Sequence, residues 1–231
     1  MAVWRMRTEP VDYETTIDEI CSLDWENLSK DALVNIAWVY YYFSIQFREN
    51  LEIACQLYPW DRKLRQLMQE ECNTDNLSPW PDVASTGERM NHDEFMRRLL
   101  TLSPIDQSRG KRLETIGQRY LNKVYEFDSM VRASSIVSYE DGGLERVFGA
   151  ILTSRDWTSP LLQAFRHFLS QHIEFDNNPT TGHGALSRHL RPGDQIIPLW
   201  TAFKHILIEA APTLLSRTAE TTEKNWVQSI I

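Results

Sequence analysis

The sequence predicts an all-helical protein, a single-domain bundle of about seven helices. Its 231 residues include 42% hydrophobic and 11% aromatic amino acids, enough for a sizeable core, but only nine glycines, too few for the many turns of an all-strand fold. Apolar residues recur at helical spacing along most of the chain, and no segment has the composition of a flexible linker. We expect an N-terminal extension packed on the bundle (1–28), a helical domain (29–218) and a frayed polar tail (219–231).

The first strong helix is expected to begin near Ser29, a favourable N-cap, and to end before Pro59. Its apolar residues form one stripe at three-and-four spacing: Leu33, Ile36, Ala37, Tyr40, Phe43, Phe47, Leu51 and Ala54. A second helix is predicted for residues 61–71, and a third for 91–100, which ends before Pro104.

The same periodicity continues in the second half of the chain, over residues 106–124, 129–152, 157–175 and 195–215. Gly142 and Gly143 interrupt the second of these segments. We interpret it as a broken or bulged helical pair, 129–139 and 144–152, rather than as a strand. Short connections between helices predict a bundle whose interior could hold a site built from facing helices.

Charge and cysteine content exclude several classes of function. The net charge of −8 argues against nucleic-acid binding through phosphates, which needs basic surfaces. The three cysteines form neither a CxxC pair nor an even disulfide set, and the first residues lack the apolar core of a signal peptide, so we expect a cytoplasmic protein. No uncharged apolar run approaches the roughly 18 residues of a membrane span.

A short segment carries His172, Asp176 and His183. On a helix, His172 and Asp176 project from one face, and imidazole with carboxylate suits iron, manganese or zinc. In an unbroken helix His183 would lie about 16 Å further along the axis, so Pro179 and Gly182 predict that the helix opens after Asp176 and that the chain returns. Taken singly, each of the three also fits a packed interior or a turn.

Polar residues in the upstream helices favour the metal interpretation. Glu140 follows a segment with little charge, Glu71 closes the second predicted helix, and His92 opens the third. In a helical bundle such positions are normally apolar, so these side chains either end helices or point into the interior.

Together these residues resemble the motifs of the heme-oxygenase-like diiron oxidases and oxygenases, which share the helical fold of heme oxygenase and of the thiaminase-like TenA proteins. Members carry a glutamate and a histidine around the second and third core helices. A glutamate follows on a later helix, and about thirty residues afterwards comes His-x-x-x-Asp-x-x-His. Here Glu140 precedes His172 by 32 residues, and His172 to Asp176 matches the start of the last motif. The resemblance covers about residues 39–190.

Two spacings depart from the family pattern. Glu71 and His92 are 21 residues apart instead of a few, with Asp75 as a competing ligand between them, and His183 follows Asp176 by seven residues instead of three or four.

The resemblance implies a site with two Fe(II) ions and O2 as cosubstrate. The ligand set that it implies is Glu71, His92, Glu140, His172, Asp176 and His183. Three carboxylates against two ferrous ions leave about one positive charge. Gln46, Glu49 or Asp75 could add a further ligand.

The implied function is that of a non-heme diiron oxidoreductase acting on a small organic substrate. An amino acid or amine in a natural-product pathway is expected, with desaturation, cyclisation, N-oxygenation or carbon–carbon cleavage as the outcome. Aromatic walls and guanidinium groups for such a substrate are offered by Trp80, Trp157, Arg188 and Arg191. An external electron donor and a homodimer are compatible with this interpretation.

Two other classes of function stay open. One is a metal-free enzyme of the same fold, like the thiaminase-like or quinone-cofactor-forming relatives, with Cys55 or Cys72 offered as nucleophile. The other is a non-catalytic helical interaction protein, although no long heptad seam supports it. The sequence singles out no catalytic residue apart from the ligands.

Overall fold

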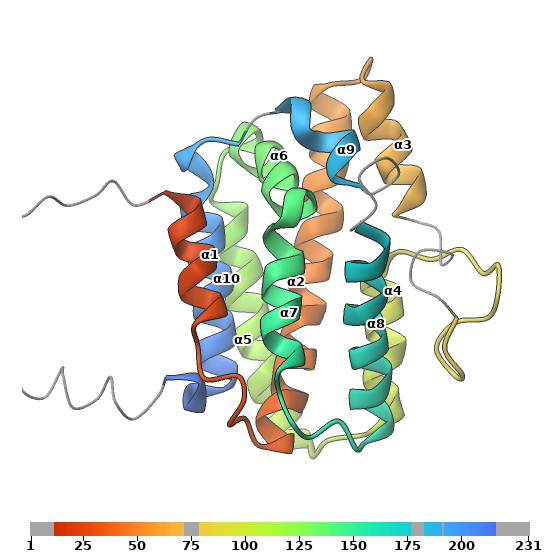
Figure 1. Cartoon of the computed structure of the whole chain (residues 1–231), viewed down its shortest axis with the longest axis vertical. Coiled ribbons are helices and arrows are strands. Elements are labelled where there is room, and N and C mark those ends of the chain that lie inside the picture. Colours follow the sequence, from red (N-terminus) through yellow and green to blue (C-terminus); the bar gives the residue numbers. More distant parts are fainter. Residues whose placement is uncertain (1–11, 72–78, 177–182, 191, 216–231) are drawn as a thin grey trace, which may run out of the picture.

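The computed structural model describes residues 12–71, 79–176, 183–190 and 192–215 (Figure 1). Within these ranges the regular structure is helical, apart from one isolated bridge between Trp80 and Ala84, which confirms the all-helical class. No helix in the described ranges is long and apolar enough to cross a membrane. The predicted tail, residues 219–231, lies outside the described residues.

The helices follow the predicted segments closely. They are α1 (Tyr13–Cys21), α2 (Lys30–Leu57), α3 (Arg62–Glu70), α4 (His92–Leu99), α5 (Gln107–Tyr125), α6 (Ser129–Ser138), α7 (Leu144–Leu152), α8 (Pro160–Asp176), α9 (Gly184–Ser187) and α10 (Ile197–Ala210). Between α6 and α7 lies the π-helical segment η2 (Tyr139–Gly143). Short 3-10 turns are η1 (Leu100–Leu102), η3 (Arg188–Leu190), η4 (Asp194–Ile196) and η5 (Pro212–Leu214).

Side-chain caps explain where the first long helices begin. The Ser29 hydroxyl accepts a hydrogen bond from the amide of Ala32 at the start of α2, and Asp61 accepts from the amides of Lys63 and Leu64 at the start of α3. Each cap satisfies backbone donors that have no partner within the helix. Both N-terminal boundaries were therefore readable from residue type alone.

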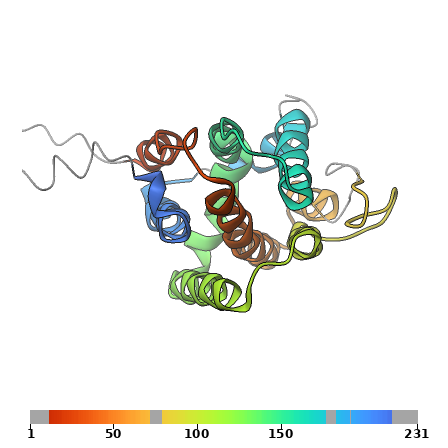
Figure 2. The same cartoon turned by 90° about the horizontal axis from the view of Figure 1, so that it is seen from below.

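Helix α2 is the central element of the bundle (Figures 1 and 2). It contacts α3, α4, α5, α6, α8 and α10, so its side chains are buried on more than one face. Seen from below, the other helices surround it (Figure 2). A helix surrounded in this way must carry apolar residues around most of its circumference, as this one does.

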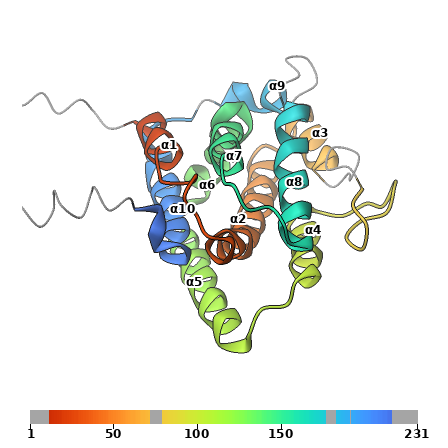
Figure 3. The same cartoon turned by 60° about the horizontal axis from the view of Figure 1, so that its bottom comes forward.

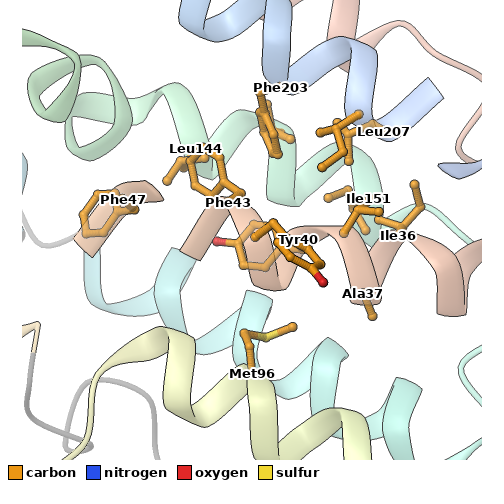
Figure 4. Packing of buried hydrophobic residues seen from close by; sticks show 14 of the residues in the cluster. Ile36, Ala37, Tyr40, Phe43, Phe47, Met96, Leu144, Ile151, Phe203 and Leu207 are labelled. Atoms are coloured by element: carbon orange, nitrogen blue, oxygen red, sulfur yellow. The ribbon is translucent and has the colours of Figure 1, made fainter. Parts of the chain in front are cut away.

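An aromatic cluster fills the middle of the bundle (Figure 4). Tyr40 of α2 is its hub, and its ring lies within 6.5 Å, centroid to centroid, of the rings of Phe43, Phe148, Phe165, Phe168 and Phe203. Tilted and edge-on contacts of this kind stabilise beyond the burial of area alone. The aromatic cluster packs against a group of buried polar residues.

Helix α1 was not predicted as a helix, only as part of an extension. It packs against α7 and α10 (Figure 3), and Ile17 and Ile20 are fully buried there. Arg146 of α7 forms ion pairs with Glu14 and Asp18. The apolar pattern of this short segment is too brief to announce a helix, so its helicity depends on tertiary packing.

Candidate metal centre

Five of the six residues predicted as metal ligands lie together in the interior of the bundle. Each comes from a different element: Glu71 from the C-cap of α3, His92 from the first position of α4, Glu140 from η2, His172 from near the end of α8, and His183 from the residue before α9. None exposes more than 9% of its surface. The elements contact one another in the pairs α3 with α9, α9 with η2, and α4 with α8.

Glu71 lies at the centre of this group, which we call the polar cluster. One carboxylate oxygen, Oε1, is 2.7 Å from Nδ1 of His183, and the other, Oε2, is 3.1 Å from Nδ1 of His92. The two oxygens therefore face two different histidines. A carboxylate in this arrangement has one donor atom available on each side, as a bridge between two cations requires.

Glu140 and His183 complete one side of the polar cluster. Nδ1 of His183 is 3.0 Å from Oε2 of Glu140. Glu71, Glu140 and His183 each offer a ligand atom, and these atoms lie within 4.8 Å of one another. All three side chains are buried, unlike the exposed acidic groups that commonly gather without a ligand.

His172 and His92 form the other side. Nδ1 of His172 lies 2.8 Å from the carbonyl oxygen of Phe168, which can only accept, so Nδ1 carries the proton. The unprotonated Nε2 then faces the cluster, 3.2 Å from Nδ1 of His92. A backbone carbonyl that fixes the tautomer and the ring orientation in this way is the usual support of a metal-binding histidine.

Glu140 reaches the cluster because the chain leaves the α-helical path at η2. Gly142 adopts φ +93°, which is favourable only for glycine. A Cβ atom on Gly143 would lie 2.0 Å from the carbonyl oxygen of Ser138. The two glycines that interrupt the sequence pattern therefore permit the wider turn that carries Glu140, and such π-segments are frequent at functional sites.

The two carboxyl groups of the cluster differ in their protonation. Burial disfavours the charged form of Glu71, but His92 and His183 outweigh it and lower the pKa of Glu71 to about 2. Burial raises the pKa of Glu140 to about 7, against the opposing hydrogen bond from His183, and the charge of Glu71 adds to the rise. Near neutral pH, Glu71 is ionised and Glu140 is partly protonated.

The three histidines of the cluster also differ in the direction in which their pKa values are shifted. Burial lowers the pKa of His92 and lowers that of His172 to about 3, so both rings are neutral and able to donate a lone pair. Burial opposes the charge on His183 as well, but Glu71 and Glu140 outweigh it and raise its pKa well above the usual value. The cluster therefore holds a proton on His183, whose ring lies against Glu71 and Glu140, and these carboxyl groups favour a positive charge at that position.

Three observations fit the donors to transition-metal ions. Nε2 of His92 is buried with no hydrogen-bond partner in the described chain, an arrangement that costs stability unless a ligand compensates it. A 10 Å³ cavity lies among Glu71, His92, Glu140 and His172, about the space of one water-sized species. Imidazole nitrogens with carboxylate oxygens are a donor set that suits iron, manganese or zinc.

The sixth predicted ligand, Asp176, is the last residue of α8, four positions after His172. Its side chain is outside the part that the structure describes, and so is Asp75, the competing ligand expected between Glu71 and His92. The helical backbone through Asp176 agrees with the predicted i, i+4 relation to His172.

Gln46 and Glu49 do not reach the polar cluster. Gln46 Nε2 donates to the hydroxyl of Tyr139 at 3.1 Å, and Glu49 pairs with Arg132 at 3.1 Å and accepts from Tyr125. Both side chains are occupied on the side of α2 that faces α5 and α6. Residues three apart on a helix share a face, and the contacts of Gln46 and Glu49 place both on the face of α2 away from the polar cluster.

Glu70 was not among the residues predicted for the site. Its Oε2 lies 3.7 Å from Nε2 of His183, while Nδ1 of the same ring faces Glu71 and Glu140. A carboxylate behind a ligand histidine orients the ring and raises its basicity. The adjacent Glu70 and Glu71 were the available signal in the sequence, but residue type alone does not show that the half-buried Glu70 faces the same histidine as Glu71.

The aromatic and basic residues expected around a substrate are placed differently. Trp157 is buried, donates to the carbonyl of Ser154 and packs on Phe165 near the opposite end of α8. Trp80 packs on His167. The side chain of Arg188 and the whole of Arg191 are outside the described residues.

No family model matches the chain, and neither do curated proteins or solved structures. The geometry of the polar cluster, together with the sequence motifs, is therefore the basis on which any functional proposal must rest.

Proposed function

We propose that this protein is an O2-dependent non-heme diiron oxidase or oxygenase with a heme-oxygenase-like bundle, acting on a small organic molecule such as an amino acid or amine. The observation that carries the proposal is the position of Glu71. One carboxylate oxygen faces His183 at 2.7 Å and the other faces His92 at 3.1 Å, inside a buried cluster. A buried carboxylate shared between two histidine groups suits a pair of metal ions better than one.

The two ions would be held by different halves of the cluster. Glu140 and His183 would hold one, His92 and His172 the other, and Glu71 both. Asp176 would join the His172 side, by its place on α8. Three carboxylates against two ferrous ions leave about one positive charge, which an anionic group can offset. When bound, the iron would supply the reducing power and the open coordination that dioxygen activation requires.

The protein itself contributes orientation and exclusion of water. The Phe168 carbonyl fixes the ring of His172, and Glu70 lies behind His183. The rings of Phe148 and Phe168 lie 5.7 and 4.3 Å from the ring of His172 and form an apolar wall. In a dry, preorganised site of this kind charged groups interact strongly, and reactive species are protected from water.

Proton release accompanies metal binding in this proposal. His183 is protonated in the metal-free cluster and Glu140 partly so, but only the deprotonated forms donate to a metal. The same groups could later return protons at the site. Metal affinity therefore increases as the pH rises towards and above neutrality.

Thiaminase-type chemistry is less consistent with the structure. Burial raises the pKa of Cys55, which reduces its reactive thiolate, and its thiol donates to the carbonyl of Leu64 at 3.5 Å. Cys72 lies outside the described residues. No described contact places a base beside Cys55, so the polar cluster remains the better-supported site.

Anaerobic loading with ferrous ion tests the proposal. We expect close to two irons per chain by metal analysis, and a transient visible absorption band on exposure to oxygen. A His172→Ala variant should lose at least one iron and keep the helical circular dichroism of the parent. His205→Ala, which removes an exposed histidine from α10, is the matched control and should bind iron like the parent. Failure of the parent protein to bind iron would refute the proposal.

A further inference from the structure

The surface along α5 differs in charge from the rest of the chain. Helix α5 carries five basic residues and one acidic residue, whereas the chain as a whole has a net charge of −8. Three of the basic side chains, Arg112, Arg119 and Lys123, are exposed and follow one another at spacings of seven and four residues, so they lie on one face of the helix. We call these three residues the basic stripe.

A groove of 250 Å³ lies between α5 and α10, beside the basic stripe. Arg119 and Lys123 line it with exposed side chains, and they pair with Glu209 and Glu126, each at 2.6 Å. Exposed ion pairs are weak, so the carboxylates of a partner can share these cations. The floor of the groove is apolar and buried: Ile116, Tyr120 and Ile206. An apolar centre with a basic rim suits an acidic protein partner.

The floor of the groove begins a hydrogen-bonded path to the polar cluster. The hydroxyl of Tyr120 donates to Oε1 of Gln46, and Nε2 of Gln46 donates to the hydroxyl of Tyr139 at 3.1 Å. Tyr139 is joined by one peptide bond to Glu140, whose Oε2 lies 3.0 Å from Nδ1 of His183. All five side chains are buried. Bonds and hydrogen bonds therefore connect the groove with the candidate metal centre through the protein interior.

A small molecule has a different entrance. A pocket of 250 Å³ opens beside the polar cluster, with Glu71 and His92 in its wall and Arg48 and Arg89 among its other lining residues. It shares no residue with the groove, which lies on the opposite side of α2 (Figure 3). A protein docked at the groove is therefore placed to pass electrons through the interior rather than to hand over a substrate.

We propose, resting on the function proposed above, that the basic stripe and the groove dock a small acidic protein that carries one electron at a time. In desaturation or N-oxygenation, reduction of O2 to water takes four electrons and the substrate gives two, so two electrons and two protons must be supplied. Two reduced carrier molecules supply the electrons in turn, each leaving oxidised by one electron, and the protons come from solvent. Such encounters bury little surface, and charge steers them.

Calorimetric titration of the metal-free, full-length protein with an oxidised plant-type [2Fe–2S] ferredoxin, an acidic one-electron carrier, tests the docking surface. Arg119→Gln should weaken binding roughly fivefold at low salt, because it removes a cation and leaves Glu209 to repel the partner. Arg155→Gln is the matched control and should bind like the parent, since Arg155 is similarly exposed and pairs with a glutamate but does not line the groove. Higher salt should weaken binding to the parent.

Electron transfer tests the path. Iron-loaded, air-oxidised protein is mixed anaerobically with reduced ferredoxin, and the ferredoxin absorbance is followed. Tyr120→Phe keeps the ring in the groove and removes the hydrogen bond to Gln46, so it should bind ferredoxin like the parent but accept electrons several times more slowly. Tyr58→Phe, which removes a hydroxyl bonded to Met130 outside the path, is the control and should match the parent. Equal rates in Tyr120→Phe and the parent would rule out this path.

Other acidic partners give distinct outcomes. Tighter binding of acyl carrier protein, which has no redox centre, or of a single-stranded oligonucleotide than of ferredoxin overturns the proposal, as does equal binding of ferredoxin to the parent and to Arg119→Gln. If the parent binds two irons but not ferredoxin, the inferred partner is wrong while the proposed function stands. If ferredoxin docks in an Arg119-dependent way but iron does not bind, the docking surface is real and the diiron proposal is wrong.

Discussion

Two buried polar groups border helix α2, and they differ in how completely their atoms are paired. On the side facing α5 and α6, Asn50 donates to Ser135 at 3.1 Å and accepts from Arg132 at 2.8 Å. Both ends of the amide are satisfied, and Gln46 is bonded at both ends in the same way, to Tyr139 and Tyr120. We call this group the amide network.

The polar cluster lies on the other side of α2, and its polar atoms are not all paired within the described chain. Imidazole nitrogens of His172 and His92 face each other at 3.2 Å, and Nε2 of His92 has no partner in the described chain. The carboxyl groups of Glu71 and Glu140 converge on one nitrogen of His183. A satisfied buried network contributes to stability, whereas a crowded, half-satisfied one is costly and is retained for another purpose. The difference separates a structural group from a candidate ligand site.

The largest effect is expected from Glu71→Gln. An amide cannot replace a carboxylate that faces both halves of the cluster, so both irons should be lost, with metal analysis falling from about two per chain to near zero. The lowered pKa of Glu71 means that its charge also stabilises the metal-free fold, so the variant should unfold at a lower temperature, and iron is compared where circular dichroism shows both proteins folded. Glu114→Gln on α5 makes the same chemical change at an exposed residue, and should retain iron. Retention of one iron by Glu71→Gln would show that Glu71 serves a single metal.

The opposite pattern is expected from Asn50→Ala in the amide network. Arg132 and Ser135 would lose a buried partner, so the free energy of unfolding should fall by about 3 kcal/mol in denaturant titrations. Iron stoichiometry should be that of the parent. An exposed asparagine of α5, Asn122, provides the control, because Asn122→Ala should change stability by less than about 0.5 kcal/mol. Loss of iron in Asn50→Ala would remove the distinction between the two groups.

A smaller, pH-dependent effect is expected from Glu140→Gln. Burial raises the pKa of Glu140 from 4.5 to about 7, so the folded state holds a proton that the unfolded state releases in between, and metal-free stability falls as the pH rises from about 4.5 to 7. The variant lacks this cost. It should be more stable than the parent by roughly 3 kcal/mol above about pH 8, and little different below about pH 4.5.

Denaturant titrations of metal-free Glu140→Gln and of the parent at both pH values measure this difference. The same variant should bind less iron than the parent, because an amide is a poor ligand for iron. A variant that is less stable than the parent at alkaline pH would indicate that Glu140 is a structural partner of His183 rather than a destabilised ligand.

The smallest effect is expected from Glu70→Gln. Weaker orientation of the His183 ring should lower iron affinity about tenfold, with no change in unfolding free energy. Gln66 donates to Glu70 at 2.8 Å, so Gln66→Ala breaks the same surface hydrogen bond and leaves the carboxylate in place. Equal loss of iron affinity in both variants would assign Glu70 a local structural role only.

Much of the fold was predictable from residue type. Ser29 and Asp61 cap helices where expected, and the glycines at 142 and 143 mark the break between α6 and α7. Five residues that were grouped from their sequence context also lie together in the structure. These residues were singled out as polar positions in otherwise apolar segments, and the resemblance to a diiron family joined them into one ligand set. Their role as ligands remains a prediction.

Other features depend on tertiary contacts that spacing does not encode. The helicity of α1 follows from its packing on α7 and α10. Trp157 was expected to form an aromatic substrate wall, but it packs on Phe165, and the pocket next to the cluster is lined by Arg48 and Arg89. Which loop lies next to a site is determined by how helices pack, and short motifs carry no information on that packing.

The π-helical segment between α6 and α7 makes the candidate centre sensitive to the number of residues in the chain as well as to their identity. Each residue added to or removed from a helix rotates the remainder of that helix by about 100°. Deleting Gly142 would let α6 run into α7 as an ordinary helix and turn Glu140 relative to α7, while the apolar faces could still pack. Loss of a single codon would therefore be enough to separate Glu140 from the polar cluster in a bundle of nearly the same shape.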